Sequence, residues 1–166
     1  MRFHHIALLL VLLLVAAQLG WYAPRLPDRI AASFGADGAP SGYDTKTEFL
    51  AWYALSLALI AGVFLALPGL LCRLPPRYVN LPHADHWLAP ERRGRTLAEL
   101  GEALGWFGVC TLLFVAWAFH LSILANLREP VRLAAGPFWA GLALYLSYLV
   151  WWMVRLMKRF GRRGRY

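Results

Sequence analysis

Charged residues are scarce in this sequence of 166 residues, since Asp, Glu, Lys and Arg together make up only 16% of it. A soluble domain usually contains about 25% charged and 45–50% apolar residues. Here the hydrophobic share is 60%. The composition therefore argues against a soluble domain, and it excludes a disordered tail.

Cysteine is also scarce, and the common catalytic motifs are missing. The two cysteines, Cys72 and Cys110, are too few for a disulfide scaffold. No P-loop, G-x-G-x-x-G or H-E-x-x-H pattern occurs. Nothing in the sequence places a histidine near either cysteine or an exposed serine, as activation of a nucleophile would require. The sequence thus favours a non-enzymatic protein over an enzyme, and it gives no reason to expect a cofactor.

What the sequence has instead is four long apolar runs without any Asp, Glu, Lys or Arg, at residues 3–22, 49–71, 104–125 and 135–154. About 20 helical residues cross a hydrocarbon core of about 30 Å. These runs predict an all-α integral membrane protein, a four-transmembrane-helix bundle forming a single domain over residues 1–166. The first run also has features of a cleavable signal peptide, but its apolar character continues to Tyr22, which favours a retained span.

The basic residues are unevenly divided between the two sides of these spans. Twelve of the 17 Lys and Arg residues lie in the N-terminus, in residues 73–103 and in the tail 155–166, whereas five lie in the other two connections. Because Lys and Arg accumulate on the cytoplasmic side, both termini are predicted to be cytoplasmic. Tryptophans close to the ends of the spans, such as Trp21, Trp52 and Trp139, fit the expected aromatic belts.

Two connections are long enough to have structure of their own. The outer loop 23–48 is rich in Pro and Gly, which predicts a compact loop with tight turns at Asp37-Gly38 and Ser41-Gly42. The inner loop 73–103 is predicted to contain an interfacial helix that continues into the third span. Its start is left open between Pro90, which suits a first helical turn, and Thr96, which begins a capping-box pattern ending at Glu99.

The outer loop reads LPDRIAASFGADGAPSGYDTK over residues 26–46, and the inner loop reads NLPHADHWLAPERR over residues 80–93. Together with the four-span layout, these stretches resemble the domain of unknown function 1648 family, which also forms the N-terminal part of the SdpI-type toxin immunity proteins of bacteria. The resemblance implies a bacterial cytoplasmic (inner) membrane protein with a role in binding or sensing. Ser33 and Tyr43 stand where that family has His and Trp, so any chemistry of that His would be missing here.

Candidate ligand-binding residues lie on the predicted outer side. Four of them are in the outer loop: Phe34, Asp37, Tyr43 and Lys46. The other two, Gln18 and His120, belong to an outer polar layer within the spans that also includes Tyr53, Ser56 and Ser122. An ionisable residue inside a span is a candidate functional residue. The simpler interpretation of His120, which we favour, is a neutral ring making one interhelical hydrogen bond.

Two further groups lie on the predicted inner side. His83, Asp85 and His86 form a weak candidate for a metal site, and a polar loop at the lipid headgroups is the favoured interpretation. The basic residues of the tail predict contact with anionic lipid headgroups rather than with nucleic acid; they are Arg155, Lys158, Arg159, Arg162, Arg163 and Arg165.

The function expected from these features is that of a non-enzymatic sensor, immunity-like or accessory protein whose outer loop contacts an extracytoplasmic ligand. The expected partners are the bilayer with its anionic inner leaflet and a membrane protein or peptide ligand. One alternative is a transporter subunit or membrane enzyme that uses the polar layer around His120. Another is a structural subunit of a larger membrane complex.

Overall fold

The computed structural model describes residues 3–75, 78–79 and 81–161, and it is mostly helical. Four long helices dominate it: α1 (Phe3–Tyr22), α2 (Lys46–Arg73), α4 (Pro90–Asn126) and α5 (Ala135–Phe160). All four are long and apolar enough to cross a membrane, which confirms the predicted fold class. Between α1 and α2 lie a short 3-10 helix, η1 (Ala23–Arg25), and two strands, β1 (Arg29–Phe34) and β2 (Pro40–Thr45). A short helix, α3 (Ala84–Trp87), precedes α4.

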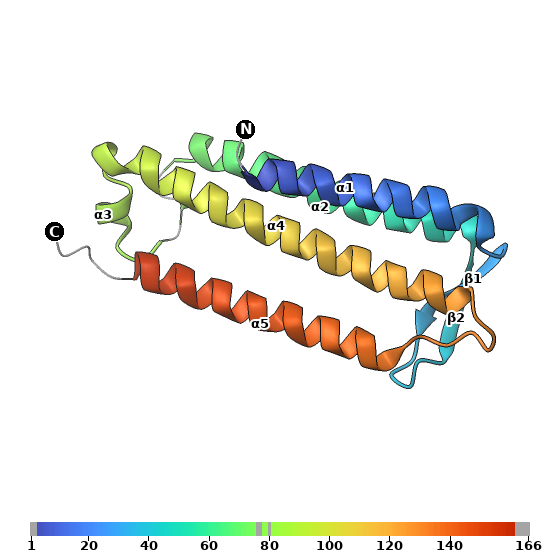
Figure 1. Cartoon of the computed structure of the whole chain (residues 1–166). Coiled ribbons are helices and arrows are strands. Elements are labelled where there is room, and N and C mark those ends of the chain that lie inside the picture. The colour runs from blue at the N-terminus through green and yellow to red at the C-terminus, as the bar shows by residue number, and fades with distance from the viewer. Residues whose placement is uncertain (1–2, 76–77, 80, 162–166) are drawn as a thin grey trace.

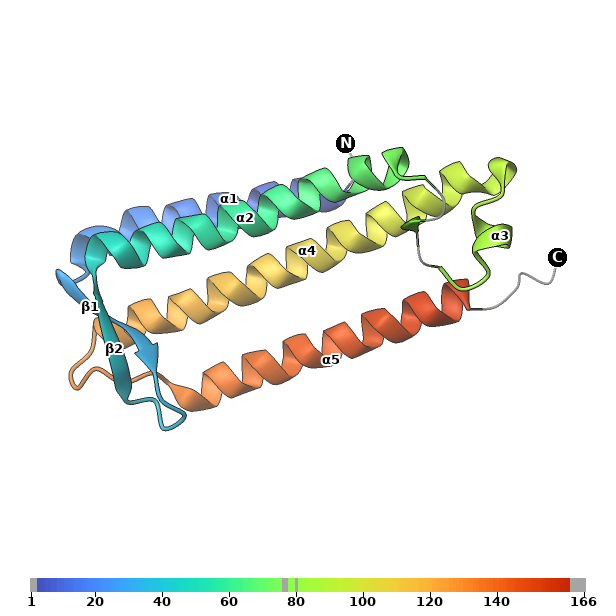
Figure 2. The same cartoon turned by 180° about the vertical axis from the view of Figure 1, so that it is seen from behind.

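Helix α4 lies in the middle of the molecule, with α1 and α2 on one side and α5 on the other (Figures 1 and 2). The two strands lie at one end of the bundle, and α3 lies at the other (Figure 1). We call these the hairpin end and the α3 end. The chain therefore places two different small structures at opposite ends of the long helices.

The core lies between α1, α2 and α4. Each of these helices buries residues spaced three or four apart, so that each presents one face to the other two; they include Leu8, Val11 and Val15 of α1, Phe49, Tyr53, Leu57 and Ala61 of α2, and Val109, Leu112 and Ala116 of α4. Glycines of α4 allow the close approach. A Cβ atom on Gly105 would overlap with the His4 ring, and one on Gly108 with the Phe64 ring.

Helix α5 is attached differently. It packs mainly along α4, and among its described residues only Phe160, at its end, is buried. The ring of Trp117 on α4 lies directly against Gly141 of α5. Most of the apolar side chains of α5 consequently face outward, where a membrane would supply lipid contacts.

The connection between α1 and α2 is a β-hairpin rather than a series of turns. The strands β1 and β2 are antiparallel, with Ala31 opposite Tyr43 and an irregularity near Ser33. The predicted turn at Asp37-Gly38 is confirmed, and Gly38 has a φ of 80° there. The predicted turn at Ser41-Gly42 is wrong, because both residues lie inside β2. Dense Pro and Gly residues thus mark one reversal of the chain, not two.

The beginning of α2 shows the capping box that the sequence analysis placed elsewhere. The Thr45 side chain accepts a hydrogen bond from the Glu48 backbone, and the Glu48 carboxylate accepts one from the Thr45 backbone. By contrast, Thr96 is buried in the interior of α4, so the alternative helix start at Thr96 is wrong. Helix α4 begins at Pro90, the earlier of the two predicted starts. Its first part continues unbroken into the third apolar run, as expected (Figure 2).

The α3 end has a small core of its own. Trp87 is 8% exposed, and its indole Nε1 donates a hydrogen bond to the Phe160 carbonyl, 2.8 Å away. Around it lies a cluster of buried apolar residues, Val79, Leu88, Leu97, Leu100 and Phe160. The inner loop therefore packs its central part, around Trp87, against the end of α5. The interpretation of His83, Asp85 and His86 as a polar loop at the headgroups stays a prediction, and His83 and Asp85 are exposed.

Candidate functional site

The hairpin is attached to the end of α4 mainly through a buried side chain, Asn126. Its Oδ1 atom accepts a hydrogen bond from the Ala31 backbone N–H at 2.7 Å, and its Nδ2 atom donates to the Ala31 carbonyl at 2.9 Å. Nδ2 also donates to the Ser122 carbonyl at 2.9 Å. The amide therefore pairs with both polar groups of one β1 residue, as a neighbouring strand would. Because Ala31 is fully buried, its N–H depends on Asn126 for a partner. Its carbonyl also accepts a hydrogen bond from the Ser122 hydroxyl at 3.5 Å.

The tip of the hairpin contacts the connection between α4 and α5. The Leu133 backbone N–H donates to the Gly38 carbonyl at 2.9 Å. A Cβ atom on Gly38 would overlap with the Leu133 carbonyl. An exposed ion pair between Arg132 and Asp37, with 3.8 Å between Nη2 and Oδ2, lies beside this contact. The hairpin thus reaches across the end of the bundle from α2 to α5.

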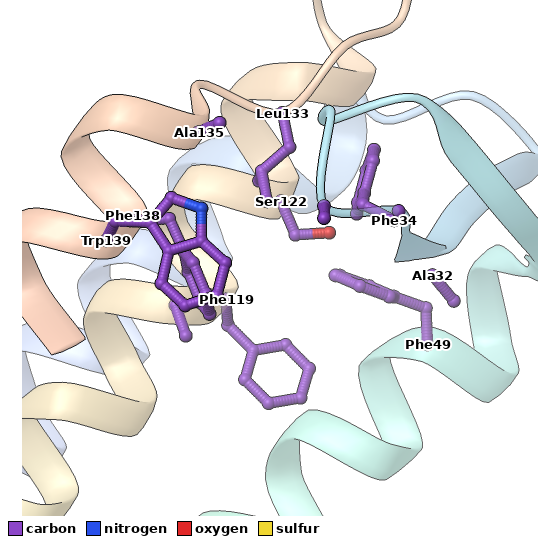
Figure 3. Close-up of a pocket in the computed structure, with 12 residues that line it drawn as sticks. Ala32, Phe34, Phe49, Phe119, Ser122, Leu133, Ala135, Phe138 and Trp139 are labelled. Carbon is purple, nitrogen blue, oxygen red and sulfur yellow. The ribbon is translucent and has the colours of Figure 1, made fainter.

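Beneath the hairpin lies a cavity of about 440 Å³, which we call the hairpin pocket. Its walls come from the hairpin, α2, α4 and α5, and they carry five aromatic rings, those of Phe34, Phe49, Phe119, Phe138 and Trp139. Figure 3 shows Phe34 and Phe49 on one side of the pocket and Phe119, Phe138 and Trp139 on the other. Ser122 provides a hydroxyl group in the wall. The pocket suits an apolar or aromatic group, because most of its lining is carbon.

A polar network lies next to the hairpin pocket. The Tyr53 hydroxyl donates to Gln18 Oε1 at 3.0 Å, and Gln18 Nε2 lies 2.9 Å from His120 Nδ1. The Tyr53 ring stacks on the pocket residue Phe119, with ring centres 4.1 Å apart. These contacts confirm that Gln18, Tyr53 and His120 share one layer. Ser56 was expected there as well, but its hydroxyl donates to the Trp52 carbonyl of its own helix.

The candidate residues of the outer loop do not form one site. Phe34 lines the hairpin pocket. Asp37 accepts a hydrogen bond from the Ala39 backbone within the turn, and Lys46 donates one to the Leu26 carbonyl at 3.0 Å. Tyr43 is 51% exposed and lies beside the Arg29 guanidinium. The loop therefore offers one pocket residue, two residues that stabilise the loop itself and one exposed ring.

The three residues of the weak metal candidate lie around α3. His83 precedes the helix with a φ of 57°, Asp85 lies in its first turn, and the His86 ring contacts Arg92 Nη1. Within residues 3–75, 78–79 and 81–161, no three His, Cys, Asp or Glu side chains are grouped so that they could hold a metal ion.

The basic residues of the tail have different surroundings. The guanidinium of Arg159 makes a two-pronged contact with the Glu99 carboxylate, with a closest distance of 2.8 Å. The Arg155 guanidinium lies 5.3 Å from the centre of the Trp151 ring. Lys158 is exposed in the last turn of α5. Arg162, Arg163 and Arg165 lie outside the described residues.

The sequence analysis missed most of the hairpin pocket. Four of its five aromatic residues lie on α2, α4 and α5, where aromatics are frequent. Of these four, the sequence singles out only Trp139, and it indicates a residue of the aromatic belt rather than of a pocket. Asn126 directly follows the third predicted span, and a polar residue at that depth was the one signal available for it. Comparison of the chain with family models, with curated proteins and with solved structures gives no match, so the resemblance of residues 26–46 and 80–93 to the domain of unknown function 1648 family stays a prediction.

Proposed function

We propose that this protein is a multi-pass membrane protein with a non-enzymatic role, which binds an apolar group of an extracytoplasmic ligand in the hairpin pocket. The observation that carries the proposal is the pocket itself: about 440 Å³, bordered by five aromatic rings and lined on one side by the hairpin. Aromatic rings contribute large contact areas and prefer aromatic or aliphatic partners. A ring or short aliphatic group carried by a small molecule or peptide is the ligand chemistry that suits this lining.

The way in which the hairpin is held supports binding rather than mere closure of the bundle. Asn126 fixes β1 to α4, and Leu133 fixes the tip to the connection before α5. Both contacts lie beside the pocket walls, so the walls are held in position before a ligand arrives. Such preorganisation reduces the entropy lost on binding. A sensor or immunity-like protein needs this property, because it must recognise one ligand among many.

The orientation is a second part of the proposal. Twelve Lys and Arg residues belong to the N-terminus, residues 73–103 and the tail, against five in the connections at the hairpin end. This division supports an α3 end in the cytoplasm and a hairpin end outside. A reporter that is active only outside the cytoplasm should work when fused after Asp37 and fail after Arg93. Activity after Arg93 would contradict this orientation.

The test of the pocket uses a photoreactive phenylalkyl diazirine as the probe. In purified protein in detergent, we expect saturable labelling within residues 32–36 and 135–139, mapped by mass spectrometry. Replacing Ala118 in the pocket wall with Trp should fill the cavity and abolish this labelling. The matched control is Ala58→Trp, because Ala58 is exposed on α2 and does not line the pocket.

The hairpin offers a second matched pair. Phe34→Ala removes a pocket wall and should weaken saturable labelling, whereas Tyr43→Ala removes an exposed ring and should leave it unchanged. Labelling that is spread evenly along the helices, and that does not respond to Ala118→Trp, would overturn the proposal.

The alternative of a transporter subunit or membrane enzyme depends on the Tyr53–Gln18–His120 network. On the side of α4 that leads from His120 toward the α3 end, the residues about one, two and three turns away are Ala116, Leu113 and Val109. These carry no polar side chain that could extend the network. A third role, as a structural subunit of a larger complex, would use the outward-facing apolar side of α5.

A further inference from the structure

A second cavity lies at the α3 end, between α4 and α5 only. Its volume is about 660 Å³. Its lining comes from residues 99–110 of α4 and 148–160 of α5, and we call it the seam pocket. It is separate from the hairpin pocket, with which it shares no residue. A ligand of the seam pocket requires the helices to lie in a membrane, and it does not depend on what the hairpin pocket binds.

The lining of the seam pocket changes in character along the helices. Four charged side chains, those of Glu99, Glu102, Arg155 and Arg159, lie toward the α3 end. Trp106, Trp151 and Trp152 come next, and Cys110 and Tyr148 lie deepest. From Glu99 to Cys110 a helix rises about 16 Å, close to half the thickness of a hydrocarbon core. The lining is therefore charged at the α3 end, aromatic below it and less polar at its deepest point. A phospholipid shows the same order of polarity from its headgroup into its acyl chains.

Two of the four charges are already paired with each other. Arg159 and Glu99 form the two-pronged ion pair described above. Among the described residues, Glu102 has no ion pair, and Arg155 has no carboxylate partner and lies against the Trp151 ring. The pocket therefore presents one cation and one anion on facing helices. An anionic headgroup would suit Arg155 but would be repelled by Glu102.

We propose that the seam pocket binds a zwitterionic phospholipid whose headgroup carries a primary ammonium group, with the phosphate near Arg155 and the ammonium near Glu102. Arg is well suited to phosphate because its guanidinium offers several donors in one plane. A primary ammonium can donate hydrogen bonds to a carboxylate, which a quaternary ammonium cannot do. The Trp rings at the level below would contact the glycerol region and the first methylene groups, as tryptophans do at membrane interfaces.

The test compares three phospholipids with identical acyl chains: phosphatidylethanolamine, phosphatidylglycerol and phosphatidylcholine. Binding to the purified full-length protein in detergent is measured by native mass spectrometry, with each pair of lipids in direct competition. The wild type should prefer phosphatidylethanolamine over both others. Because an exposed charge-assisted contact contributes modestly, we expect Glu102→Gln to reduce this preference about three- to tenfold. Arg155→Gln should weaken phosphatidylethanolamine and phosphatidylglycerol alike.

Matched controls come from the same two helices. Lys158 on α5 and Glu91 on α4 carry the same charges near the same end, and neither lines the seam pocket. Lys158→Gln and Glu91→Gln should leave the lipid preference unchanged. The lipid ratio within one sample is insensitive to the amount of folded protein, so it reports on the site itself.

Three results would overturn the inference. Equal binding of phosphatidylcholine and phosphatidylethanolamine would show that the ammonium donors make no specific contact. Tighter binding of phosphatidylglycerol, unaffected by Glu102→Gln, would show a general anionic-lipid surface. Equal effects of the pocket and control substitutions on the lipid preference would show that the charges at the α3 end attract lipid headgroups without forming a defined binding site.

Discussion

Removal of the Asn126 amide should destabilise the hairpin more than removal of any other single polar side chain described above. Asn126→Ala removes three hydrogen bonds and leaves the Ala31 N–H without a partner in a fully buried position. The Ala31 carbonyl keeps only a longer hydrogen bond, from the Ser122 hydroxyl at 3.5 Å. A buried group left unpaired costs about 1–3 kcal/mol. For one unpaired N–H and one weakened carbonyl contact, we expect the free energy of unfolding to fall by about 1–3 kcal/mol.

Two other substitutions provide comparisons for the expected loss of stability in Asn126→Ala. Hydrogen bonds between membrane helices contribute on average about 0.6 kcal/mol, because the separated partners find other partners. Gln18→Ala removes such contacts, those with Tyr53 and His120, and should cost about that much. Asn126→Asp keeps an acceptor for the Ala31 N–H but turns a second oxygen toward the Ala31 carbonyl. It should therefore be nearly as destabilising as Asn126→Ala.

The assay is equilibrium unfolding in mixed micelles of increasing sodium dodecyl sulfate content, followed by circular dichroism. Hydrogen exchange at the Ala31 amide gives a local readout in the same samples. If Asn126→Ala lowers the free energy of unfolding by no more than Gln18→Ala, and Ala31 stays protected from exchange, then the amide is not what holds the hairpin and the reasoning fails.

Two glycines give further predictions. Gly38→Ala should lower the free energy of unfolding by about 1–2 kcal/mol, because Gly38 has a left-handed backbone and an added Cβ would overlap with the Leu133 carbonyl. The same substitution should weaken labelling of the hairpin pocket, and unchanged labelling would contradict the contact at the hairpin tip. Gly108→Ala should destabilise the packing of α2 on α4 by about 1–3 kcal/mol through overlap with Phe64, whereas Gly62→Ala, with open space around it, should not; equal unfolding midpoints for the two variants would contradict this packing.

The helices and the polar layer could be predicted from the sequence because their signals are local. Uncharged runs of spanning length gave the four helices, and counting residues from the ends of the spans placed Gln18, Tyr53 and His120 at one level. The depth of a residue within its span does not determine, however, in which direction around the helix axis its side chain points. Ser56 lies near the same level, but its hydroxyl bonds to its own helix.

The hairpin and its attachment depend on contacts between distant residues, and local patterns do not reveal these. Asn126 and Ala31 are 95 residues apart, and nothing near either of them indicates the other. The capping box is a different case. The pattern Thr45 to Glu48 stands directly before an apolar run and could have been recognised, but the same pattern at Thr96 to Glu99 was considered instead. The local sequence does not show which of the two patterns caps a helix. The burial of Thr96 inside α4 distinguishes them, and that burial is visible only in the folded structure.

The attachment of α5 along α4 has a consequence for how the seam pocket fills. All of its lining lies on these two helices, while α1 and α2 lie on the far side of α4 (Figure 1). In a membrane, the pocket would therefore open sideways into the lipid, with its charged end at the interface. A molecule would enter it by lateral diffusion within one leaflet. Occupancy would then depend on the mole fraction of that lipid in the leaflet, so the composition of the host membrane, rather than any dissolved concentration, would determine how often the site is filled.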